Sequence, residues 1–111
     1  MTLIRIVAIG CTVAVVGFGA AQAEDVQVAI DNFTFNPPQV KVKAGTKVTW
    51  TNFDEILHTV TTGTPPTGPA TFDGKLDGKG TSFAFTFDRP GVYKYFCQRH
   101  PEAMTGEVDV T

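Results

Sequence analysis

The chain has 111 residues, of which 42% are hydrophobic and 18% are charged, a composition typical of one ordinary globular domain. Its formal net charge is −2, from 9 Lys and Arg against 11 Asp and Glu. This weakly acidic balance excludes the strongly basic surface that nucleic-acid binding requires.

Residues 1–23 are predicted to be a secretory signal peptide. Arg5 gives a basic start, residues 6–20 are almost wholly apolar, and Ala21-Gln22-Ala23 is an A-x-A cleavage site. An uncleaved membrane anchor is the weaker alternative, because a spanning helix needs roughly 20 apolar residues, and no stable membrane insertion is expected. The mature domain would be residues 24–111 in the periplasm, with a net charge of −3 after the loss of Arg5.

Alternation of apolar and polar residues predicts β-strands along the first half of the mature chain. Residues 26–35 alternate, with an interruption at Asp31-Asn32, and residues 40–42 and 48–50 follow the same pattern. Pro37-Pro38 marks a bend or an edge between strands, because proline cannot donate to a central ladder.

The second half is predicted to contain strands on either side of a long loop. His58 opens one strand, and residues 63–80, rich in Gly, Pro and Thr, are predicted to be the longest loop. Three alternating segments follow at residues 83–87, 93–97 and 107–110, and Cys97 ends the inward-facing row of its strand.

These short strands, separated by Gly and Pro turns, predict an all-β fold. We expect a Greek-key β-sandwich of about seven to eight strands, built from two antiparallel sheets. Trp50 and the Phe, Val and Tyr side chains would form its core. No disulfide is expected in the mature domain, because Cys97 is its only cysteine once Cys11 leaves with the signal peptide.

The mature chain also holds a small set of metal-binding residue types. Cys97, His100 and Met104 lie on one connection between strands, and His58 follows another loop, so the two loops could meet at one end of the sandwich. Each residue alone is more often a packing or surface group. Together, two imidazoles, a thiolate and a weak thioether suit copper, because sulfur favours Cu(I) and imidazole also accepts Cu(II).

Four segments carry a more specific likeness. They are Phe33-Thr34-Phe35-Asn36-Pro37, Val48-Thr49-Trp50-Thr51-Asn52, His58-Thr59-Val60 and Tyr93-Lys94-Tyr95-Phe96-Cys97-Gln98-Arg99-His100-Pro101. They resemble the cupredoxin family of blue copper proteins over nearly all of residues 26–110, and most of all the small bacterial amicyanin, pseudoazurin and plastocyanin group. The resemblance implies one type 1 copper held by His58, Cys97 and His100, with Met104 as axial ligand.

Two departures from that group concern the ligand loops. The spacing Cys-x2-His-x3-Met has one residue more than in amicyanins and one fewer than in plastocyanins and pseudoazurins. Thr59 stands where asparagine often follows the first ligand, and its hydroxyl is expected to tie the two ligand loops together.

The resemblance implies a mobile one-electron carrier rather than an enzyme. A monomer is expected, which would meet a redox donor and a redox acceptor protein through brief contacts near His100. The apolar residues expected around His100 are Phe53, Leu57, Pro65, Pro66 and Pro101. Phe96, beside Cys97, is expected to serve packing rather than a second electron route.

Four other readings compete with the carrier. Native zinc is disfavoured because methionine is a poor zinc ligand. A thiol nucleophile, or a nitrite reductase with a second copper centre, would need a further histidine, and the chain has only two. A periplasmic protein that binds or delivers copper on the same fold, without a role in a redox chain, stays open as the alternative.

Overall fold

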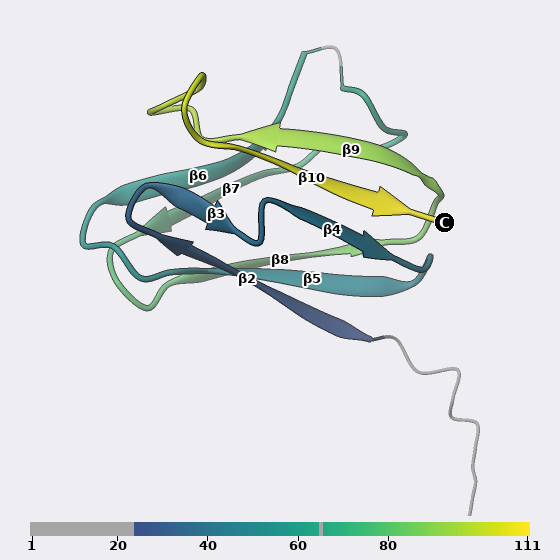
Figure 1. Ribbon diagram of the computed structural model, residues 1–111, viewed down its shortest axis with the longest axis horizontal. Coiled ribbons are helices and arrows are strands. Elements are labelled where there is room, and N and C mark those ends of the chain that lie inside the picture. The colour runs from purple at the N-terminus through teal and green to yellow at the C-terminus, as the bar shows by residue number, and fades with distance from the viewer. Residues whose placement is uncertain (1–23, 65) are drawn as a thin grey trace, which may run out of the picture.

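The computed structural model describes residues 24–64 and 66–111 as two β-sheets packed face to face (Figure 1). In chain order the strands are β2 (Asp25–Asp31), β3 (Thr34–Asn36), β4 (Gln39–Val42), β5 (Thr46–Asn52), β6 (Leu57–Thr62), β7 (Asp73–Asp77), β8 (Ser82–Phe87), β9 (Gly91–Phe96) and β10 (Thr105–Val110). Within this described part we find no apolar helix of the length that crossing a bilayer requires. The predicted signal peptide, with its Cys11, and Pro65 lie outside the described residues.

Both sheets are mixed. One has the strand order β4-β10-β9-β6-β7 and the other has the order β3-β2-β5-β8. The predicted all-β sandwich is confirmed, but wholly antiparallel sheets are wrong, because β10 runs parallel to β4 and β2 runs parallel to β5. At Pro37-Pro38 the chain leaves the β3-β2-β5-β8 sheet, adds β4 to the other sheet and then returns as β5. The predicted bend is therefore the crossing between the sheets that makes both pairs parallel.

Strand β7 was missed by the sequence analysis, which predicted one loop over residues 63–80. The strand pairs with β6 and places Leu76 opposite His58. Leu76 is the only large apolar residue in its sequence Asp-Gly-Lys-Leu-Asp, so no alternation was visible. Gly74 is required here, because a side chain would collide with the ring of Phe83. With β3 also separate, the described residues form nine strands rather than seven to eight.

The core lies between the sheets and is centred on Trp50, as predicted. Its side chain is fully buried, and its ring meets that of Tyr95 edge-on at a centroid distance of 5.3 Å. Burial raises the pKa of Tyr95 to about 12. The inward row of Tyr93, Tyr95 and Cys97 is confirmed, since at most 2% of each residue is exposed. The buried row therefore extends from the core to Cys97 at the end of the sandwich.

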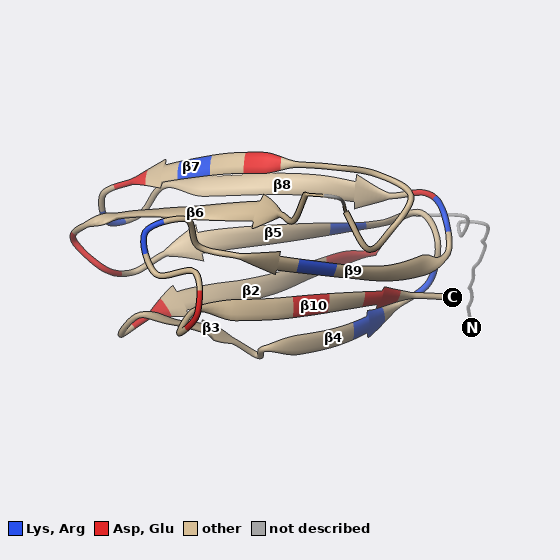
Figure 2. Cartoon of the chain, turned by 90° about the horizontal axis from the view of Figure 1, so that it is seen from above, with Lys and Arg blue, Asp and Glu red and all other residues tan. Residues whose placement is uncertain are grey.

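The β2–β3, β5–β6 and β9–β10 connections lie at that end of the molecule, together with the β7–β8 connection (Figure 1). Segments more than 60 residues apart, such as Asn32-Phe33 and Cys97–Met104, are therefore neighbours in space. Figure 2 shows charges of both signs at this end, with red segments on the β5–β6 and β9–β10 connections and blue segments on the β7–β8 and β9–β10 connections. The fold thus places all four predicted ligands at one end of the sandwich.

Candidate metal centre

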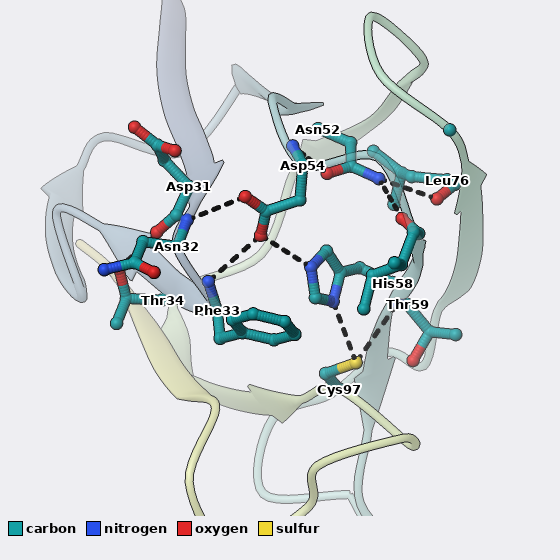
Figure 3. A network of polar contacts seen from close by, with 12 residues as sticks. Asp31, Asn32, Phe33, Thr34, Asn52, Asp54, His58, Thr59, Leu76 and Cys97 are labelled. Atoms are coloured by element: carbon teal, nitrogen blue, oxygen red, sulfur yellow. Dashed lines mark hydrogen bonds and ion pairs between the residues drawn. The ribbon is translucent and has the colours of Figure 1, made fainter.

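His58 is held between two partners at the start of β6. Its ring is fully buried, its Nε2 lies 2.9 Å from Asp54 Oδ2, and its Nδ1 lies 3.7 Å from Cys97 Sγ (Figure 3). A carboxylate can only accept a hydrogen bond, so Nε2 of the neutral imidazole carries the proton. The lone pair therefore sits on Nδ1, the nitrogen that faces the sulfur.

Asp54 connects His58 to the β2–β3 turn. Its carboxylate accepts hydrogen bonds from the amides of Asn32 at 2.9 Å and Phe33 at 3.0 Å, in addition to the bond from His58. Burial alone would raise the pKa of Asp54, but the bonds from the Phe33 and Asn32 amides and from His58 outweigh it and hold that pKa below the usual value near 3.8. The carboxylate is therefore ionised at neutral pH and fixes the orientation of His58.

Asn52 in turn fixes the loop that carries Asp54. Its buried side chain accepts the Asp54 amide at 2.9 Å and donates to the carbonyls of Ile56 at 2.8 Å and Leu76 at 3.0 Å. The side chain thereby closes the β5–β6 connection on itself and ties it to β7. Because these partners are backbone groups, the position of Asp54 depends on the fold rather than on mobile side chains.

The Asn32-Phe33 turn has an unusual backbone. Both residues have positive φ angles, 54° and 61°, a region that costs non-glycine residues roughly 1–2 kcal/mol each. The two amide bonds to Asp54 offset this strain. In return the Phe33 ring, although 45% exposed, meets the His58 ring at 5.5 Å and the His100 ring at 5.2 Å, both edge-on. Phe33 therefore covers both imidazoles on one side.

The connection after β9 is closed by its own backbone. The amide of Cys97 donates to the carbonyl of Met104 at 3.0 Å, the His100 amide donates to Cys97 at 3.0 Å, and the Met104 amide donates to His100 at 2.9 Å. Cys97 and Met104 are both buried. The three ligands predicted on this connection are thus joined to one another directly through the main chain.

Thr59 links this connection to β6, as the sequence analysis expected. Its hydroxyl accepts the amide of Gln98 at 2.8 Å, and its own amide donates to Cys97 Sγ at 3.4 Å. Hydrogen bonds at the cysteine sulfur are one of the means by which a protein tunes a thiolate–copper centre. Thr59 therefore contacts Cys97 directly through the sulfur, and also holds the amide of Gln98, the next residue in the chain.

The four predicted side chains converge to different degrees. His58 and Cys97 are in contact, while the ring centroid of His100 lies 6.0 Å from that of His58. Residues 24–64 and 66–111 contain no group of three or more His, Cys, Asp or Glu close enough to hold a metal ion. However, His100 Nε2 is buried without a hydrogen-bond partner, which is rare for a native polar group unless a ligand or metal completes it. With the buried sulfur of Met104 on the same turn, the donor types fit copper.

Asp54, Asn52 and Phe33 were not singled out from the sequence. The only local signal was the carboxylate four residues before His58, a spacing that has no fixed meaning in a loop. Of the apolar residues expected around His100, Leu57 is half-buried, while Ile56 beside it, which was not named, is 41% exposed.

The Asp54→Asn variant tests whether this carboxylate orients His58. We expect copper affinity to fall about 10- to 100-fold, as is typical when the partner of a metal-binding histidine is lost. In the metal-free protein, the lowered pKa of Asp54 stabilises the fold above its usual value near 3.8, and this contribution disappears as the pH falls further. Acid unfolding of the variant should therefore show a weaker pH dependence.

Glu55→Gln is the matched control, because Glu55 is an exposed carboxylate on the same loop. Metal titration and acid unfolding, followed by circular dichroism, would compare both variants with the parent. Equal changes in the two variants would mean that general loss of charge, and not the bond to His58, is responsible.

Known proteins are similar to this chain in sequence and in fold. Amicyanin-alpha of Methylorubrum extorquens is 34% identical over 90 residues, covering 81% of this chain and 75% of the relative. A Cu(I) structure of an amicyanin variant superposes with a TM-score of 0.71 at 31% identity, covering 85% of this chain and 90% of that one.

The same fold also occurs inside a larger enzyme. The copper-containing nitrite reductase of Thermus scotoductus SA-01 matches with a TM-score of 0.71 at 30% identity, over 78% of this chain but only 22% of the enzyme chain. The family model described as copper-binding proteins of the plastocyanin/azurin family matches residues 22–111. The resemblance of the sequence to blue copper proteins is thereby confirmed, and this chain belongs to the plastocyanin/azurin family of copper-binding proteins.

Proposed function

We propose that this protein is a mobile one-electron carrier in which His58, Cys97, His100 and Met104 would hold one copper ion. The observation that carries the proposal is the contact of His58 Nδ1 with Cys97 Sγ at 3.7 Å in a buried site. Copper bound there supplies a Cu(II)/Cu(I) couple. The chain contributes rigid support, since both residues are anchored to strands and hydrogen-bonded from outside the site.

The histidine count supports a carrier over an enzyme. The chain has two histidines, and both lie at this centre, so none is left to build a second metal site or to act as a general base. The nitrite reductase that shares the fold is several times longer than the segment that matches. A copper-delivery role on the same fold is the alternative that the first experiment below separates.

Export to the periplasm is part of the proposal. Cleavage after Ala23 would leave the mature chain one residue before β2, which begins at Asp25, so every described strand would be retained. The single cysteine of that mature chain would be protected by metal binding and by its complete burial.

Docking of redox partners is proposed at the apolar surface beside the centre. Phe33, Phe53 and Ile56 are 45%, 49% and 41% exposed, and all lie on connections at this end of the sandwich. Pro101, on the β9–β10 connection, is exposed as well. Pro66, which the sequence analysis also placed here, instead precedes Thr67, which bonds to Val92 and Lys94 of β9. A patch of this kind suits brief redox encounters, which typically bury less than about 1,200 Å² in total and need no stable complex. The working form is proposed to be a monomer.

The visible spectrum of the Cu(II)-loaded mature protein tests the proposed ligands. We expect an intense blue absorption that Cys97→Ala abolishes, because the band requires a thiolate on copper. Gln98→Ala should keep it, since the side chain of Gln98 is exposed and only its backbone joins the site. A colourless parent, or colour that survives in Cys97→Ala, would refute the site. Repeated reduction and oxidation without loss of metal supports a carrier, whereas transfer of copper to a chelating acceptor supports delivery.

The Ile56→Asp variant tests the docking surface. Two copies that meet through this patch would bring the introduced charges together, so electron self-exchange should slow by about tenfold or more at low ionic strength. Val92→Asp is the control, because Val92 is equally exposed, at 43%, but lies at the start of β9, away from the centre. Equal rates in both variants, measured by NMR on mixed oxidation states, would remove the patch from the proposal.

A further inference from the structure

We propose that Asp73, on β7, positions the copper-binding loop through the hydroxyl groups of Thr61 and Thr59. This inference rests on the proposed function, because it concerns the loop that would hold copper. Three contacts form the chain: Gln98 N to Thr59 Oγ1 at 2.8 Å, Thr59 Oγ1 to Thr61 Oγ1 at 3.1 Å, and Thr61 Oγ1 to Asp73 Oδ1 at 2.8 Å. We call these four residues the threonine relay.

The carboxylate sets the direction of the two hydroxyl bonds in the relay, whereas the Gln98 amide can only donate. An ionised carboxylate only accepts, and each hydroxyl has a single proton to donate. The Thr61 proton is therefore directed to Asp73, which leaves the Thr61 oxygen to accept the proton of Thr59. The lone pairs of Thr59 are then free for the amide of Gln98. Bonds aligned in one direction polarise and strengthen one another.

The sheet fixes the geometry of the relay. Thr59 and Thr61 are two residues apart on β6, so their side chains project from the same face. Thr61 lies directly opposite Asp73 in the β6–β7 ladder and opposite Phe96 in the β6–β9 ladder. The relay therefore runs across neighbouring strands from the outer strand β7 to the residue that follows Cys97.

Burial keeps water away from the two threonines of the relay. Thr59 is 2% exposed and Thr61 is 7% exposed, while Asp73 is exposed at the strand start. A buried hydroxyl that loses its partner keeps the full cost of its desolvation. Removing the carboxylate would thus leave two buried hydroxyls without a preferred direction, and the bond to Gln98 would weaken.

The end of the relay matters because Thr59 also contacts the sulfur. Its amide donates to Cys97 Sγ at 3.4 Å, so any shift of Thr59 reaches Cys97 both through that bond and through the Gln98 amide. Asp73 itself touches none of the four proposed ligands and is a positioning residue. A simple role in joining β6 to β7 would stabilise the strands without affecting Gln98.

Hydrogen exchange of the Gln98 amide in the metal-free protein distinguishes these roles. We expect Asp73→Ala to speed this exchange about tenfold, the effect of losing a charge-assisted bond. Asp77→Ala is the matched control, because Asp77 is the exposed carboxylate at the other end of β7, and it should leave the rate unchanged. A Gln98 rate in Asp73→Ala equal to that in Asp77→Ala would overturn the proposal.

Two substitutions of Thr61 give a second, independent test. Thr61→Val should speed Gln98 exchange as Asp73→Ala does, and Thr61→Ser should restore nearly the parent rate because it keeps the hydroxyl. Combining Asp73→Ala with Thr61→Val should add no further change if both act through one relay. Additive effects would show that Asp73 acts by another route. A Cu(II)-loaded protein that is not blue would refute the proposed function, while the exchange rates would still decide the relay.

Discussion

The bond between the Asp54 carboxylate and His58 is the interaction on which the rest of the centre depends. It gives the imidazole a defined tautomer, and the same carboxylate holds the Asn32 and Phe33 amides of a strained turn. Loss of this group would release two segments at once: the start of β6, and the β2–β3 turn with the Phe33 ring over the two histidines. Local strain and ligand orientation therefore both depend on one partly buried carboxylate.

The mixed sheets explain how that anion comes to lie beside Cys97. The chain adds β4 to the five-stranded sheet before it returns to the four-stranded sheet as β5. As a result, the β2–β3, β5–β6 and β9–β10 connections all lie at the same end of the sandwich. Each connection is then fixed separately, one by bonds from the Asn52 side chain to the backbone and the other by backbone bonds within the Cys97–Met104 turn. The only direct contacts between the two ligand connections involve Cys97 and Gln98 with His58 and Thr59, among the hydrogen bonds of the described residues.

Much of the fold was predictable because one face of most strands is buried, and alternation then shows in residues such as Tyr93, Tyr95 and Trp50. Strand β7 was not, since it buries one large side chain and depends on Gly74 for close packing. The parallel pairs could not be predicted either, because they follow from the path of the chain and not from local pattern. For the centre, residue types that suit copper were visible in the sequence. The roles of Asp54 and Phe33 could not be predicted, because they arise only from the conformation of the loops.

Crystal structures of the protein without metal and with Cu(I) and Cu(II) would test this account most directly. We predict copper bound to His58 Nδ1, Cys97, His100 and Met104, with the bond from His58 Nε2 to Asp54 unchanged in all three states. Side chains that keep their positions as the charge changes would explain why electron transfer needs little rearrangement. Copper bound elsewhere, or a His58 ring that leaves Asp54 when the metal binds, would contradict it.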